Sequence, residues 1–234
     1  TFLLGILLSV TLIAESDNLK KGKKFFDDND YISAEYYFLT ALYENQEKES
    51  YYYISKIFNQ NKKRELAKKY ADLAIENGDK RAFNELGNYY RAIKNEALAE
   101  EYYKKSIEAG NYESLFNLTL VYLDQKNLGL AEKTAIQGID KKAKNSNFVL
   151  GLVYYTQEKY DLAEKYLKIA VEKKERDAIE VLASLYMERE NYALARKYLD
   201  MGIKNNSNTS LILYADIELY SGNYNKVQDY LDLL

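Results

Sequence analysis

The sequence predicts an all-α fold, a right-handed α-α superhelical solenoid built from about seven two-helix repeats. One residue pattern recurs seven times along the 234 residues at nearly fixed spacing. Apolar positions follow the helical spacing of three and four, and no long alternating run indicates a strand. Pro is absent, which suits a chain that is helical throughout, because an interior Pro would break a helical hydrogen bond.

The recurring pattern is clearest in residues 191–203, where it predicts the second helix of a repeat. A turn residue, Asn191, is followed by Ala195, by the apolar Leu199 and by the small Gly202. The last three lie on one helical face. The position of Ala195 has seven copies, separated by one interval of 33 residues and five of 32: Ala34, Ala67, Ala99, Ala131, Ala163, Ala195 and Val227.

A small residue lies 12 positions before each of these sites, where we expect the first helix to approach the second closely: Gly22, Ser55, Gly87, Thr119, Gly151, Ala183 and Ala215. An aromatic residue follows three positions later in six copies, and Glu218 is the exception. Each apolar stripe is too narrow to be covered within its own helix pair. Neighbouring repeats must therefore stack.

We expect one domain over residues 15–234, with approximate repeats 15–47, 48–79, 80–111, 112–143, 144–175, 176–207 and 208–234, the last incomplete. Turn-forming residues separate the two helices in five repeats and lysines do so in two: Asp30, Asn95, Asn127, Asn191 and Asn223, then Lys63 and Lys159. We expect the second helices to finish in the left-handed region near Asn45, Gly78, Gly110, Lys142, Lys174 and Asn206.

Residues 1–14, TFLLGILLSVTLIA, form an uncharged apolar run. The run is shorter than the roughly 20 residues of a membrane-spanning helix and matches the apolar region of a secretory signal, about 7 to 15 residues. It therefore favours an export signal, although it has no basic residues before it. A retained membrane anchor and an apolar helix packed on the first repeat are the alternatives.

Composition excludes several functional classes. The chain contains neither Cys nor His, so thiolate sites, cysteine nucleophiles and the usual general base are absent. A net charge of -3, with both signs interspersed, disfavours a nucleic-acid partner. No phosphate-binding loop, metal motif or spaced carboxylate pair is present. We therefore expect no enzymatic activity, no cofactor and no bound metal, and membrane contact only if residues 1–14 act as an anchor.

Two sets of residues resemble the tetratricopeptide repeat consensus: Phe83, Leu86, Gly87, Tyr90, Ala99, Tyr103 and Ser106, and then Asn147, Leu150, Gly151, Tyr154, Ala163, Leu167 and Ala170. The text LAIENGDKRAFNELGNYY is similar to the related Sel-one-like repeat. The period of 32 is shorter than the usual 34 or so, and the Pro that normally follows the second helix is missing. The resemblance implies a bacterial, non-enzymatic protein that binds other proteins.

In tetratricopeptide arrays, first-helix positions beside the packing stripe line the concave groove. Carried over to this chain, they are polar and basic in the first three repeats: Lys20, Lys23, Tyr52, Lys56, Asn84, Asn88 and Arg91. In the fourth and fifth repeats they are apolar: Phe116, Leu120, Leu123, Phe148, Leu152 and Tyr155. Something should cover this apolar face, whether a bound peptide, another subunit or the curl of the superhelix itself.

The sequence thus favours an exported scaffold or adaptor that binds a protein or peptide segment in this groove. Apolar anchors would occupy the centre, and the basic end would receive an acidic group. The alternative is an assembly or oligomerisation module of a larger chain or complex, with the apolar face buried against it.

Overall fold

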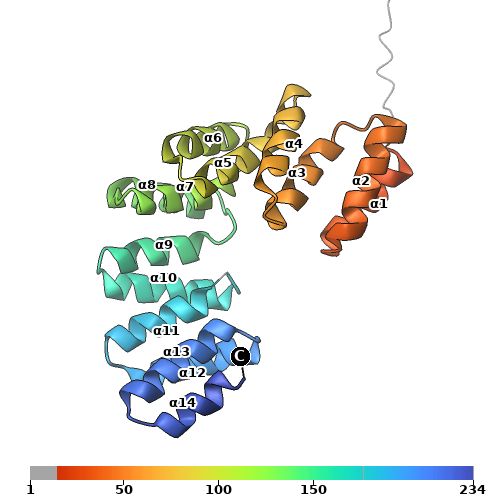
Figure 1. Ribbon diagram of the computed structural model, residues 1–234. Helices are drawn as coiled ribbons and strands as arrows, with labels where there is room; N and C mark the ends of the chain where they lie inside the picture. The colour runs from red at the N-terminus through yellow and green to blue at the C-terminus, as the bar shows by residue number, and fades with distance from the viewer. Residues whose placement is uncertain (1–14, 176, 234) are drawn as a thin grey trace, which may run out of the picture. The chain divides into compact units, whose positions relative to one another are not determined.

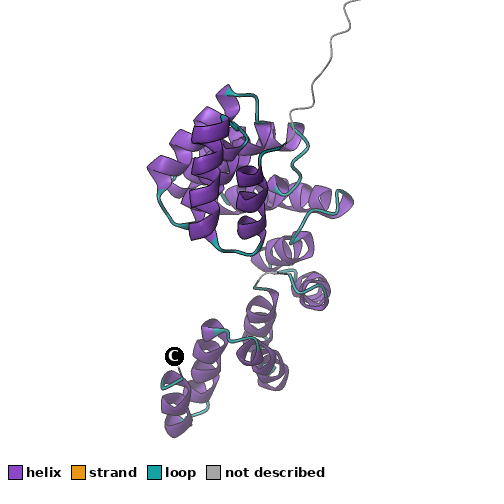
Figure 2. Ribbon diagram, turned by 90° about the vertical axis from the view of Figure 1, so that its right-hand side faces the viewer, coloured by secondary structure: helices purple, strands orange, loops and turns teal. Residues whose placement is uncertain are grey.

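The computed structural model describes residues 15–175 and 177–233, which form fourteen α-helices and one short 3-10 turn (Figure 1). Every regular element among them is helical (Figure 2). The α-helices are α1 (Asp17–Asp27), α2 (Tyr31–Asn45), α3 (Ser50–Gln60), α4 (Arg64–Glu76), α5 (Phe83–Ala92), α6 (Glu96–Glu108), α7 (Ser114–Asp124), α8 (Leu128–Asp140), α9 (Ser146–Thr156), α10 (Tyr160–Glu172), α11 (Ala178–Glu188), α12 (Tyr192–Lys204), α13 (Asn208–Tyr220) and α14 (Tyr224–Leu231), and the 3-10 turn is η1 (Lys80–Ala82).

The chain divides into two compact units, one ending at Tyr89 and the other beginning at Tyr90. In the first unit, α1 packs on α2 and α3 packs on α4, and α2 also contacts α3. In the second unit, the pairs α7–α8, α9–α10, α11–α12 and α13–α14 follow the same plan, and each pair contacts the next. The prediction of an all-α fold of stacked helix pairs is confirmed. Residues 1–14 lie outside the described residues.

The residues predicted to separate the helices are the N-caps of the second helices. Each of the seven lies immediately before its helix, with φ between -81° and -92°. At four of them a side-chain oxygen accepts a hydrogen bond from the backbone N–H three residues later, at 3.1 or 3.2 Å: Asp30, Asn95, Asn127 and Asn191. These bonds satisfy backbone donors that a helix leaves unpaired at its start.

The left-handed residue of each interhelical turn comes one position earlier than the N-cap. It has φ between 56° and 73° in every copy: Asn29, Lys62, Lys94, Lys126, Glu158, Glu190 and Gly222. Only the last is Gly, so six copies hold a residue with a Cβ in a conformation that is unfavourable by roughly 1–2 kcal/mol. Five of the seven are Lys or Glu, which carry no turn signal, so the sequence did not predict this position of the repeat.

The second helices end as predicted in five of six repeats. Gly78, Gly110, Lys142, Lys174 and Asn206 all have positive φ. The expectation for Asn45 was wrong, because Asn45 is the last residue of α2 and the left-handed residue is Gln46, with φ 53°. The reason is helix length: α2 has 15 residues whereas α4 has 13.

Small residues mark the close approach of the two helices within a pair, as predicted. All seven predicted small residues are buried. A Cβ built on Gly22 would lie 2.7 Å from the ring of Phe38, and one on Gly151 would lie 2.8 Å from Cγ of Leu167 and 3.2 Å from its backbone nitrogen. Both contacted side chains are fully buried.

A second set of small residues, which the sequence analysis did not identify, marks the contact between successive pairs. These buried residues recur every 32 positions near the start of the first helices: Ser50, Ala82, Ser114, Ser146, Ala178 and Ser210. Ser114 donates a hydrogen bond to Ser106 Oγ at 2.8 Å, and a Cβ on Gly138 would lie 2.8 Å from Ser146 Oγ. Small residues thus define both contacts of the array.

Gly151→Leu should destabilise the protein by about 1–3 kcal/mol or more, because the added side chain would overlap Leu167 at the contact between α9 and α10. Gly129→Leu is the matched control, since the nearest atom to a Cβ added at Gly129 is Asn127 Oδ1, at 4.0 Å. That change should be neutral or stabilise by up to about 0.8 kcal/mol. Urea unfolding measures the free energy of unfolding of both variants. Equal losses of stability would contradict the assignment of Gly151 to the close contact between α9 and α10.

Lys126→Gly should stabilise the protein by about 0.5–1 kcal/mol, because Lys126 has φ 57° and Gly removes the steric penalty there. Lys133→Gly, on the exposed face of α8, should instead destabilise by about 1 kcal/mol. Thermal melts should therefore shift in opposite directions. A loss at Lys126 would show that the lysine side chain contributes more than the backbone geometry does.

Candidate functional site

The apolar residues predicted to line a groove lie on two neighbouring helices of the second unit. Phe116, Leu120 and Leu123 project from α7, and α9 contributes three residues at the same spacing. Helices α7 and α9 contact each other. The rings of Phe116 and Phe148 lie 6.3 Å apart between centroids, with an interplanar angle of 28°. The two triplets therefore lie on neighbouring helices that meet at Phe116 and Phe148, and we call the six residues together the α7–α9 surface.

Burial differs among the six residues of this surface. Phe148 is only 6% exposed and belongs to the interior of the unit. The other five are half-buried and pack against that core: Phe116, Leu120, Leu123, Leu152 and Tyr155. Phe148 thus belongs to the core, and the other five side chains are partly exposed.

Polar contacts bound the α7–α9 surface at the ends of its helices. The hydroxyl of Tyr155 donates a hydrogen bond to Glu188 on α11 at 2.5 Å. Burial, followed by this bond to a carboxylate, raises the pKa of Tyr155 above its ordinary value. Arg91 forms an ion pair with Asp124 at 3.1 Å, at the end of α7. The α7–α9 surface is therefore flanked by polar groups that already have partners within the chain.

The basic residues predicted for the groove lie mainly in the first unit, and they too contact neighbours. Lys23 pairs with Glu15 and with Glu49. Burial lowers the pKa of Lys23, but the hydrogen bonds to these two carboxylates outweigh burial and raise the pKa above its ordinary value. Lys56 lies over the rings of Phe26 and Tyr52, at 5.0 and 5.5 Å from their centroids.

The two predicted amides have polar neighbours on the same helix. Asn84 and Asn88 donate to the carboxylate of Glu85 at 3.3 and 3.4 Å. Lys20, exposed on α1, lies 4.0 Å from Asp17. An acidic ligand group would have to compete with the chain's own carboxylates at these positions.

A ladder of Tyr–Glu contacts, which the sequence analysis also missed, links successive pairs of the second unit. The tyrosine hydroxyls of three first helices each donate to a glutamate 22 residues earlier, at 2.9 to 3.2 Å: Tyr122 to Glu100, Tyr154 to Glu132 and Tyr186 to Glu164. The pKa of Glu100 is lowered chiefly by its bond to Lys104, with Tyr122 contributing.

The apparent exception to the aromatic pattern completes the ladder with a charged pair. Glu218 stands where these three repeats have Tyr, and Arg196 stands where they have Glu. Arg196 donates to Glu218 Oε1 from Nε at 3.2 Å and from Nη2 at 3.0 Å. Two positions 22 residues apart that change together were a signal available in the sequence.

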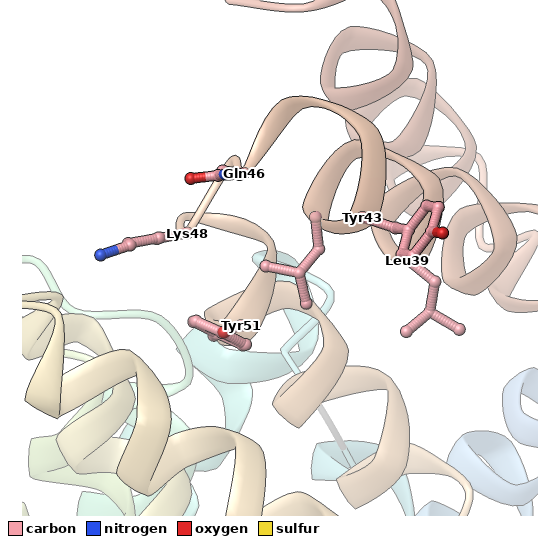
Figure 3. A pocket seen from close by; sticks show the side chains of 6 residues that line it. Leu39, Tyr43, Gln46, Lys48 and Tyr51 are labelled. Atoms are coloured by element: carbon pink, nitrogen blue, oxygen red, sulfur yellow. The ribbon is translucent and has the colours of Figure 1, made fainter.

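A separate hollow of about 660 Å³ lies in the first unit between α2 and α3 (Figure 3). Its lining is Leu39, Leu42, Tyr43, Gln46, Lys48 and Tyr51. Within residues 15–175 and 177–233, no three acidic side chains come together as metal ligands would. No helix in this part of the chain is both long and apolar enough to cross a bilayer.

Comparison with known proteins gives structural matches alone. No protein-family model matches the sequence, and no curated protein matches it. The structure is similar to a tetratricopeptide repeat protein from Parabacteroides merdae, at 16% identity and a TM-score of 0.64, over 92% of this chain and 96% of that one. It is also similar to a Sel1 repeat protein from Oxalobacter formigenes, at 18% identity and a TM-score of 0.67, over 93% of this chain and 96% of that one.

This chain has the tetratricopeptide-type repeat fold. A third similar structure is a chain of the APC/C hetero-tetramer Cut9-Hcn1, at 17% identity and a TM-score of 0.71, over 90% of this chain and 42% of that one. The resemblance to tetratricopeptide and Sel-one-like repeats, recognised from scattered residues, is thereby confirmed for the fold.

In this repeat fold, Glu218 should make stability depend on pH. Its bond to Asn223, followed by that to Arg196, lowers the pKa of Glu218. The stabilisation is therefore complete above the unfolded pKa of about 4.3 and is lost as the pH falls through the lower folded value. Urea unfolding between pH 7 and pH 3 should show a smaller acid loss in Glu218→Gln than in the wild type.

Glu172→Gln removes one carboxylate from the exposed face of α10 and is the matched control for Glu218→Gln. Its acid dependence should follow that of the wild type. Identical profiles for both variants would contradict the role of the Glu218–Arg196 pair.

Proposed function

We propose that this protein is a non-enzymatic repeat scaffold that binds a protein or peptide segment on the α7–α9 surface. The observation that supports it is the row of five half-buried apolar side chains across two adjacent helices. A helix with one solvent-facing side normally carries polar residues there. Contiguous exposed apolar surface in a folded protein commonly marks an interaction site.

The neighbouring pair provides an internal contrast. Glu180, Ser184 and Met187 occupy on α11 the positions that Phe148, Leu152 and Tyr155 occupy on α9. The apolar character is therefore a property of α7 and α9 and not of the repeat. Helix α11 packs against α10 and α12 without this apolar set.

The chemistry of the α7–α9 surface suits a segment with two or three apolar side chains at helical or extended spacing. The basic residues of the groove remain a prediction for an acidic group on that segment. Of the predicted basic residues, Arg91 is the closest in sequence to α7, and its ion pair with Asp124 is partly exposed. A carboxylate on the bound segment would replace Asp124 as the ion-pair partner of Arg91. One similar structure is a chain of the hetero-tetramer Cut9-Hcn1, which supports a protein partner.

Two further expectations accompany the proposal. The lack of Cys and His supports a binding function without catalysis, because the usual nucleophiles and bases are missing. Export to the cell envelope remains a prediction from residues 1–14, which lie outside the described residues.

The test is selection of binding peptides from a display library on the full chain, followed by calorimetric titration of the enriched peptides. The double variant Leu120→Ser, Leu152→Ser should weaken binding at least tenfold, equivalent to about 1.4 kcal/mol. Ile136→Ser, Leu162→Ser is the matched control, because these residues are 41% and 40% exposed on α8 and α10. It should leave binding unchanged, with both variants shown to be folded by circular dichroism.

Peptides that bind the Leu120, Leu152 variant as tightly as the wild type would contradict the proposal. So would a library that yields no peptide above background on the wild-type chain.

A second candidate function, assembly into a larger complex, is favoured by the last helix pair. Large apolar side chains on α13, on α14 and just beyond are 45–83% exposed: Ile212, Leu219, Tyr220, Tyr224, Leu231 and Leu233. Helix α14 has no buried residue. Sedimentation over a hundredfold concentration range distinguishes this candidate, because self-assembly through this surface would raise the mass with concentration, and peptide binding alone would not.

A further inference from the structure

Helix α2 carries a row of apolar residues on the face turned away from its own core. Four residues spaced by four, three and four positions form the row, with exposures of 86%, 64%, 38% and 90%: Ile32, Tyr36, Leu39 and Tyr43. This spacing places them along one side of the helix. We call these four residues the α2 stripe. The core of the first unit uses the other face of α2, through Ala34, Phe38 and Ala41.

The α2 stripe differs from the equivalent positions of two other second helices, α4 and α10. On α4 these positions are Glu65, Lys69, Asp72 and Glu76, and on α10 they are Asp161, Lys165, Lys168 and Glu172. Both helices pack within their pairs with charged residues there, so that packing does not account for the stripe. Contiguous exposed apolar side chains commonly mark a contact with another surface.

The spacing of the α2 stripe suits a second copy of the same helix. Steps of four, three and four residues are those of a coiled-coil seam, and they are symmetric about the middle of the stripe. When two α2 helices lie antiparallel, Ile32 of one copy is therefore opposite Tyr43 of the other, and Tyr36 is opposite Leu39. A two-fold axis repeats each of these contacts. The stripe is thus complementary to itself.

The hollow between α2 and α3 favours the antiparallel arrangement. Leu39 and Tyr43 belong both to the stripe and to the lining of the hollow (Figure 3). Antiparallel pairing brings Ile32 of the second copy to this end of the stripe, where the hollow has room for an aliphatic side chain. A parallel pair would instead place two Tyr43 rings opposite each other at one end and two Ile32 side chains at the other, so its layers would be unequal in thickness.

Pairing of two α2 helices would remove little charge from water. Helix α2 contains no basic residue and two acidic ones, Glu35 and Glu44. The positions that flank the seam on either side are Ser33, Glu35, Thr40 and Leu42, and only one of them is charged. The desolvation cost that often offsets burial of charged groups is therefore small at this contact.

The area of the contact is near the lower limit for a specific interface. A fully buried aromatic side chain covers about 150–250 Å². Two stripes together supply four Tyr, two Ile and two Leu, so their pairing would bury on the order of 1,000 Å², close to the roughly 1,200 Å² at which stable interfaces begin. We therefore expect a weak pair that dissociates on dilution.

We propose that two copies of this protein pair through their α2 stripes, as antiparallel helices related by a two-fold axis. Ile32 of each copy then lies at the hollow between α2 and α3 of the other. The pairing covers an apolar face that a single chain leaves in solvent. The proposal does not depend on the α7–α9 surface or on the last helix pair, because none of its residues belongs to either.

The test is crosslinking between single-cysteine variants of the full chain, which has no Cys of its own. Chains with Ile32→Cys are mixed with isotopically heavy chains with Tyr43→Cys and treated with a short bismaleimide. Mass spectrometry should detect dimers of one light and one heavy chain. Dimers of two light or two heavy chains should be rare, because equal positions in an antiparallel pair lie about 16 Å apart along the helix axes.

The matched control mixes Glu65→Cys with Glu76→Cys, the corresponding positions on α4, and should give no crosslinked dimers. Dimers formed only within the Ile32→Cys chains or only within the Tyr43→Cys chains would indicate a parallel pair and overturn the proposal. Equal yields from α2 and α4 would overturn it too.

A second measurement is the mass of the full chain by sedimentation over a hundredfold concentration range. The wild type should change from one copy to two as the concentration rises. Tyr36→Asp, Leu39→Asp should move the midpoint of this change at least tenfold higher, because it places charge in the seam. Lys69→Glu, Asp72→Lys on α4 should leave the midpoint unchanged, and circular dichroism checks that both variants are folded.

The same measurement separates this pairing from association through the last helix pair. Leu219→Asp, Leu231→Asp should leave the midpoint unchanged, since these exposed residues lie on α13 and α14. A midpoint that responds to this variant and not to Tyr36→Asp, Leu39→Asp would overturn the proposal. A wild-type mass that stays at one copy throughout the range would overturn it as well.

Discussion

Close approach of helices at small residues is the constraint on which the rest of this structure depends. Within a pair, a Cβ added to Gly151 would meet Leu167 at 2.8 Å. Between pairs, Ser106 and Ser114 are near enough to share a hydrogen bond. Because both contacts recur at intervals of 32 residues, with one interval of 33 within the pairs, the same packing positions return in each pair and the outward positions are free to vary. Function in such a fold resides in those variable positions.

The sequence predicted what this constraint determines. Small, aromatic and apolar residues recur because packing requires them, so the helices, their N-caps and the 32-residue interval were all recognisable. The left-handed turn residues escaped prediction, because the fold imposes a positive φ on Lys126 and Glu158 without requiring Gly. Asn45 was misplaced because a longer α2 shifts the cap by one residue to Gln46.

The candidate site was predicted less completely, for a different physical reason. The 32-residue interval predicts which helix carries a residue and on which face of that helix it lies. Leu120 and Leu152 were therefore correctly placed on the contacting helices α7 and α9. The interval does not predict how deeply each side chain is buried. Phe148 is buried in the core, whereas the other residues of the two triplets are half-buried. Partners across repeats, such as Arg196 with Glu218, depend on pairs of distant residues, and a single-helix pattern does not reveal them.

Hydrogen exchange of the full chain, with and without a peptide selected by binding, tests the central claim most directly. The account predicts slower exchange at the carboxyl-terminal halves of α7 and α9, where Leu120, Leu123, Leu152 and Tyr155 lie, with exchange in α2 and α14 unchanged. Protection confined to α2, or to the last helix pair, would contradict the assignment of ligand binding to the α7–α9 surface.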